Sequence, residues 1–161
     1  MELFAGLVHS WLGAIHLVFS LLSLTGGSFV LLLPKGNRRH KKMGYLYLSS
    51  MAIVNASSLG IYRLTGTFGV FHVAAIVDFL TLIGGMIPLF WSGLDRRTRG
   101  MHLWFMYYSV LGLYAAFVAE ISVRIPGAPF YPTVGLATLV IFGVGTLFII
   151  RKEMEWQKYF L

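Results

Sequence analysis

The stretch "VFHVAAIVDFLTLIGGMIPLFW", residues 70–91, decides the fold class, because it is almost wholly apolar. About 20 consecutive apolar residues in a helix suffice to cross the hydrocarbon core of a bilayer. Four further stretches of this kind predict helices over residues 6–33, 45–62, 103–123 and 131–150. The sequence therefore predicts an all-α integral membrane bundle of five transmembrane helices, forming a single transmembrane domain over residues 1–161.

The composition of the whole chain agrees with a lipid bilayer as its surroundings. Of 161 residues, 57% are hydrophobic and 12% are charged, whereas about a quarter of the residues of a soluble domain are charged. The absence of cysteine excludes disulfides and thiolate metal sites. The net charge of +7 could suggest nucleic acid. The basic residues, however, lie in short clusters between apolar runs, which is typical of membrane topology, so no nucleic-acid partner is expected.

The distribution of lysine and arginine predicts how the chain crosses the membrane. With five spans, three basic clusters share one face: Lys35, Arg38, Arg39, Lys41 and Lys42; Arg96, Arg97 and Arg99; Arg151, Lys152 and Lys158. The opposite face has only Arg63 and Arg124. Because positive charge accumulates on the cytoplasmic side, we expect the N-terminus outside and the C-terminus in the cytoplasm.

Polar and small residues recur at helical spacing within the apolar segments. The stripes are His9, Gly13, His16, Ser20, Ser23 and Gly27 on the first helix, Asn55, Ser58 and Tyr62 on the second, Asp78, Thr81 and Gly85 on the third, and His102, Ser109, Gly112, Ala116 and Glu120 on the fourth. Polar residues in a membrane helix usually face the protein interior. The pattern thus predicts a polar-lined core of four helices, with the fifth helix peripheral.

The histidines fall into two layers, one near each membrane face. We expect His9 or His16 to pair with His72 in the outer layer, and His40 to pair with His102 in the inner layer. Histidine is a frequent axial ligand of haem iron. The layering favours two b-type haem groups, held between histidines of facing helices. The leading hypothesis is a small membrane redox protein that passes electrons across the membrane.

Arginines near the two layers could bind the haem propionates, because guanidinium and carboxylate match in geometry. Arg63 and Arg124 are the candidates on the outer side, and Arg39 or Arg96 on the inner side. Such a protein would work with a redox partner or within a larger membrane complex.

Other functions remain open on the same residues. His16, His72, Asp78 and Glu120 could bind zinc or another divalent metal in a membrane enzyme. Against this, the chain has no HExxH motif, and His72 and Asp78 lie roughly 120° apart around a helix. A non-catalytic subunit and a proton-coupled transporter are further alternatives. Glu120 and Arg124 also have the spacing of a structural i,i+4 ion pair.

Two segments resemble a known group of proteins. "RRHKKMGYLY", residues 38–47, resembles the His-Arg-x-x-Gly-x-x-Tyr element of a bacterial family of predicted membrane proteins with no assigned function. His40, Gly44 and Tyr47 fit the element, and Lys41 replaces the usual arginine. "MHLWFMYYSVLGLYAAFVAEISVRIP", residues 101–126, is similar to the fourth-helix segment of that family.

The resemblance covers most of the first four helices and implies a multi-span bundle in the bacterial inner membrane. The element that contains His40 and Gly44 is also similar to haem-ligating segments of the cytochrome b561 and ferric reductase type. This second similarity is short, and it implies haem as the cofactor.

Overall fold

The computed structural model describes residues 10–62, 66–91 and 95–157, and throughout these ranges the regular structure is helical. The helices are α2 (Trp11–Leu32), α3 (Arg38–Ser58), α4 (Val70–Trp91), α5 (Arg96–Ser122) and α6 (Phe130–Gln157). The predicted all-α architecture is therefore confirmed. By length and composition, α2, α4, α5 and α6 can each cross a membrane. Helix α3 is the exception, since its first turns carry arginine and lysine.

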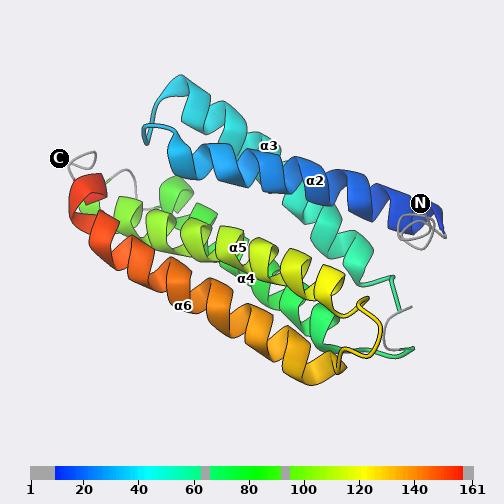
Figure 1. The fold of residues 1–161 in the computed structure, drawn as a ribbon. Helices are drawn as coiled ribbons and strands as arrows, with labels where there is room; N and C mark the ends of the chain where they lie inside the picture. The colour runs from blue at the N-terminus through cyan, green and yellow to red at the C-terminus, as the bar shows by residue number, and fades with distance from the viewer. Residues whose placement is uncertain (1–9, 63–65, 92–94, 158–161) are drawn as a thin grey trace. The chain divides into compact units, whose positions relative to one another are not determined.

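The chain divides into two compact units, Met1–Leu80 and Thr81–Leu161, with the boundary inside α4. In the first unit, α2 (blue in Figure 1) and α3 (cyan) run side by side as an antiparallel hairpin. A Cβ atom on Gly26 would lie 3.4 Å from the backbone of Tyr47, so glycine permits a close approach of the two helices. Tyr47 is consequently fully buried.

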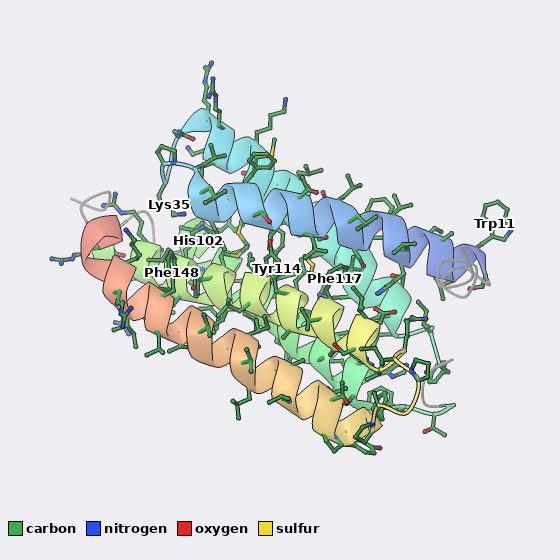
Figure 2. The ribbon with its side chains drawn as sticks, viewed as in Figure 1. Trp11, Lys35, His102, Tyr114, Phe117 and Phe148 are labelled. Atoms are coloured by element: carbon green, nitrogen blue, oxygen red, sulfur yellow. The ribbon has the colours of Figure 1, made fainter. Side chains whose placement is uncertain are left out.

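The turn between α2 and α3 is built by Gly36 and Lys35. Gly36 has a φ of +80°. A residue with a side chain would be strained in this backbone conformation. The Lys35 Nζ donates hydrogen bonds to the carbonyls of Val30 (2.9 Å) and Leu31 (2.8 Å), so it satisfies two acceptors at the C-terminal end of α2. Figure 2 shows Lys35 at this end of α2. Burial lowers the pKa of Lys35 to about 8.

The predicted start of the second helix at residue 45 is wrong. Helix α3 begins at Arg38, because the Asn37 side chain accepts the backbone N–H of His40 at 2.7 Å and caps the first turn. Hydropathy cannot detect a helix start that is made of charged residues. His40 therefore lies in the first turn of α3, not in a connecting segment.

The fourth helix likewise begins earlier than predicted, at Arg96 and not at residue 103. The Asp95 carboxylate accepts the backbone N–H of Thr98 at 2.7 Å. Hydrogen bonds from the Thr98 side chain and, next, from its backbone N–H lower the pKa of Asp95. His102 is thereby placed in the second turn of α5. The third helix spans residues 70–91 as predicted, and the fifth extends to Gln157, beyond the predicted residue 150.

In the second unit, α5 and α6 (orange in Figure 1) run side by side in opposite directions. The Tyr107 hydroxyl donates to the Gly145 carbonyl at 2.7 Å, and the hydroxyls of Tyr108 and Thr146 are 3.1 Å apart. A Cβ atom on Gly145 would lie only 2.5 Å from the Leu111 side chain. A glycine thus sets how closely the two helices approach.

Candidate functional site

The predicted ligand histidines lie on different helices and in both units. His16, on α2, and His40 and His72, on α3 and α4, belong to the first unit, and His102, on α5, belongs to the second. His9 and Arg63 were also predicted to be site residues, and they lie outside the described residues. The hydrogen bonds of each ring decide which nitrogen carries the proton, and therefore which nitrogen is able to bind iron.

His102 is held in the protonation form of a ligand. Its Nδ1 lies 2.9 Å from the Gly85 carbonyl oxygen. A carbonyl only accepts hydrogen bonds, so Nδ1 carries the proton and the neutral ring has its lone pair on Nε2. Metal-bound histidines commonly donate their other ring N–H to a backbone carbonyl in this way. Figure 2 shows His102 on α5.

The segment of α4 that faces His102 contains two consecutive glycines, which carry no side chains. A Cβ atom on Gly84 would lie 3.0 Å from the Phe105 ring, and one on Gly85 would lie 3.0 Å from the Met106 sulfur. Pro88, inside the same helix, has no N–H with which to bond a carbonyl one turn earlier. In an α-helix the missing N–H of Pro88 would have bonded the Gly84 carbonyl, not the Gly85 carbonyl that His102 contacts. The two glycines are therefore what lets a side chain of α5 reach the backbone of α4 here.

His16 is held in the same protonation form by a different route. Its Nδ1 lies 3.0 Å from the Ser57 hydroxyl oxygen on α3. Ser57 donates its own proton to the Val54 carbonyl at 3.0 Å, so the hydroxyl oxygen accepts from His16. The assignment follows from the hydrogen-bond network. The neutral His16 ring therefore also has its lone pair on Nε2.

His72 is held in the opposite form. Its Nδ1 accepts the backbone N–H of Gly69 at 3.1 Å, so the proton of the neutral ring lies on Nε2. The rings of Tyr62 and Phe68 lie 4.6 and 4.9 Å away, centroid to centroid. Iron cannot bind a protonated Nε2, so this arrangement does not favour the predicted role of His72 as the partner of His16.

The other predicted inner ligand, His40, lies in a strongly basic turn of α3. Arg38, Arg39, Lys41 and Lys42 around it are exposed, whereas His40 is half-buried. It belongs to the first unit and His102 to the second. The predicted pairing of these two histidines therefore stays a prediction.

The acidic residues have partners of their own. Asp78 on α4 accepts a hydrogen bond from the Asn55 amide on α3 at 2.7 Å, so Asn55, a member of the predicted polar stripe of the second helix, bonds between helices. Glu120 forms a 2.7 Å ion pair with Arg124 one turn further along α5, as the i,i+4 spacing predicted. The proposed contact of Arg124 with a haem propionate stays a prediction.

The predicted metal cluster is not seen. Within residues 10–62, 66–91 and 95–157, no group of three or more His, Asp or Glu residues is arranged to hold a metal ion. The set His16, His72, Asp78 and Glu120 was grouped by depth along the helices, and depth does not fix direction around the helix axis. Three of its members instead contact Ser57, Gly69 and Asn55.

Sequence reasoning missed the groups that orient the histidines. Ser57 lies next to a residue of the predicted stripe. The spacing of polar residues, however, does not reveal that the Ser57 hydroxyl donates to the Val54 carbonyl. The Gly85 carbonyl has no sequence signal beyond the Gly84-Gly85 pair. Gly69 could have been found, since a helix cap with a polar acceptor three residues later is a recognised pattern.

Comparison with known proteins adds no further constraint, since no family model, curated protein or solved structure matches the chain.

Proposed function

We propose that the chain is a small multi-pass membrane protein that binds b-type haem through His16 and His102 and passes electrons across the membrane. One observation carries the proposal: in both histidines Nδ1–H is held by an acceptor, so Nε2 has the lone pair that a ligand needs. The acceptors are chemically unrelated, a hydroxyl and a backbone carbonyl, yet both select the same protonation form.

The number of available ligands favours haem over zinc. The porphyrin supplies four nitrogens to its iron, so one or two imidazoles complete a haem site. Zinc needs three or four protein ligands, and the described residues contain no such group. Histidines that lie singly on different helices are therefore better suited to haem, which supplies the redox chemistry when bound.

The depth of the two histidines fits a path across the bilayer. His16 lies about 8 Å from the start of α2, and His102 lies about 9 Å from the start of α5. In the five-span topology α2 begins outside and α5 begins inside, so the two sites would lie near opposite faces. The proposal includes the bacterial inner membrane, a cytoplasmic C-terminus, and a polar-lined core with α6 peripheral.

The optical spectrum of the purified chain tests this function. We expect a red protein with a Soret band that shifts on reduction with dithionite. His16→Ala and His102→Ala should each remove about half of the haem, while Tyr131→Leu, an exposed residue of α6, should leave the haem content unchanged.

Two results would overturn the proposal. One is a colourless protein after expression with an ample supply of haem. The other is full haem content in the double variant of His16 and His102. A colourless protein that contains stoichiometric zinc would point instead to the metal-dependent enzyme.

A further inference from the structure

His72 is a buried donor that the proposed haem sites leave unused. Its side chain is only 3% exposed, and Nδ1 is occupied by the Gly69 N–H. Its Nε2 is buried, and it has no hydrogen-bond partner in the part of the chain that the structure describes. Buried polar groups are nearly always hydrogen-bonded in folded proteins, so an exception calls for an explanation.

We propose that the Nε2–H edge of His72 is a binding site for a lipid-soluble quinone, with a quinone carbonyl oxygen as the acceptor. Naming the quinone as the electron carrier of this protein rests on the proposed function. The binding itself rests only on the surroundings of His72.

The direction of the hydrogen bond between Gly69 and His72 determines whether the ligand must donate or accept. Because Nδ1 accepts from a backbone N–H, Nε2 is protonated and acts as a donor. The ligand must therefore present an oxygen or nitrogen acceptor. Cations are excluded, since a protonated ring nitrogen has no lone pair to offer them.

The neighbouring rings indicate a flat ligand. Tyr62 and Phe68 lie within stacking distance of the imidazole, at interplanar angles of 31° and 29°. Both side chains are about half exposed, at 46% and 56%, so each ring can contact a second molecule while it covers His72. Aromatic rings favour offset stacking with other planar groups.

The place of His72 in the chain indicates a ligand from the bilayer. His72 is the third residue of α4, a helix that is apolar enough to cross a membrane. An apolar molecule with a polar ring at one end would reach this level from the lipid. A quinone combines the three required features: a carbonyl acceptor, a planar ring and an apolar tail. A fatty acid has an acceptor and a tail, but it has no ring.

Two substitutions at His72 separate binding from folding. Gly69 precedes α4 and His72 is its third residue, the position where Glu or Gln accepts the N–H of the capping residue. His72→Gln and His72→Glu should therefore both keep the bond from Gly69. At pH 8 only the glutamine retains an N–H donor for the ligand.

Titration with a fluorescent hydroxyquinoline N-oxide, a quinone analogue, tests the site on the detergent-solubilised full chain. We expect His72→Glu to weaken binding about tenfold, the loss of one hydrogen bond. His72→Gln should stay near the wild type. Phe68→Leu should weaken binding several-fold, and Tyr131→Leu on α6 should have no effect. Thermal unfolding of all four variants checks the fold.

The results separate this inference from the proposed function. Equal affinity of His72→Glu and His72→Gln would overturn the quinone site, as would displacement of the analogue by oleate but not by a short-chain ubiquinone. Haem content is measured in the same samples. Loss of the analogue with haem intact rejects only the quinone site, and binding of the analogue without haem rejects only the haem protein.

Discussion

The two units place polar groups inside apolar helices in different ways. In the first unit, polar side chains meet one another, as His16 meets Ser57 and Asn55 meets Asp78. In the second unit, two side chains of α5 meet backbone carbonyls, at Gly85 and Gly145, in addition to the hydroxyl pair of Tyr108 and Thr146. The first arrangement requires two polar residues at matching depth. The second requires one polar residue and a glycine that lets the helices approach.

This difference predicts where each unit is vulnerable. The first should be sensitive to the loss of a polar partner, and the second to the gain of a side chain at glycine. Both arrangements nevertheless leave a histidine with its lone pair on Nε2. The two units thus stabilise the same protonation form of histidine with different acceptors, a hydroxyl in the first and a backbone carbonyl in the second.

Gly145→Val should have the largest effect. The added atoms would collide with Leu111, since even a Cβ atom would lie 2.5 Å from that side chain, and overpacking of this kind typically costs about 1–3 kcal/mol. The matched control is Gly143→Val on the same helix, where a Cβ atom would meet nothing within 4 Å. Unfolding in mixed micelles measures both. Equal destabilisation of the two would refute the close approach of α5 and α6 at Gly145.

Asn55→Leu tests the first unit. It removes the amide that donates to Asp78 at 2.7 Å, and hydrogen bonds between membrane helices contribute about 0.6–2 kcal/mol. The same unfolding assay should give a loss in this range. Combining Asn55→Leu with Asp78→Leu should be less damaging than the sum of the single changes. Strict additivity would mean that the pair does not interact.

A pH-dependent effect is expected from Lys35. Burial lowers its pKa to about 8 in the folded chain, from 10.5, so between these values the unfolded state binds more protons. The free energy of unfolding should therefore rise with pH from about 8 to about 10.5. Lys35→Met should remove this part of the rise. An unchanged slope in the variant would show that Lys35 is not the group responsible.

Glu120→Gln should have the smallest effect. Glu120 and Arg124 are 38% and 30% exposed, and an exposed i,i+4 ion pair contributes about 0.3–0.5 kcal/mol. We expect a difference near this value at low salt, vanishing at high salt. A loss above about 2 kcal/mol would indicate that the pair is desolvated within the folded protein.

Much of the fold could be predicted because apolar length is a strong signal. Residues 70–91 form the predicted helix, and Asn55 and the Glu120–Arg124 pair behave as their spacing suggested. The starts of α3 and α5 could not be predicted from hydropathy, since the capping side chains of Asn37 and Asp95 precede charged turns.

The candidate site was less predictable, for a physical reason that the two units illustrate. Sequence spacing identified His16 and His102 as inward-facing candidates, but the protonated nitrogen depends on a neighbour from another helix. Ser57 is visible in the sequence as a polar residue, whereas the Gly85 carbonyl is a backbone group that every residue has. His72 was grouped with His16 by depth alone, and its bond to Gly69 sets it apart.

The most direct test of the central claim is the haem-to-protein ratio of the wild type, of the double variant His16→Ala/His102→Ala, and of His72→Glu. We expect haem in the wild type, none in the double variant, and the wild-type ratio in His72→Glu. A double variant that keeps its haem, or a His72→Glu variant that loses it, would contradict the assignment of ligands by the protonated ring nitrogen.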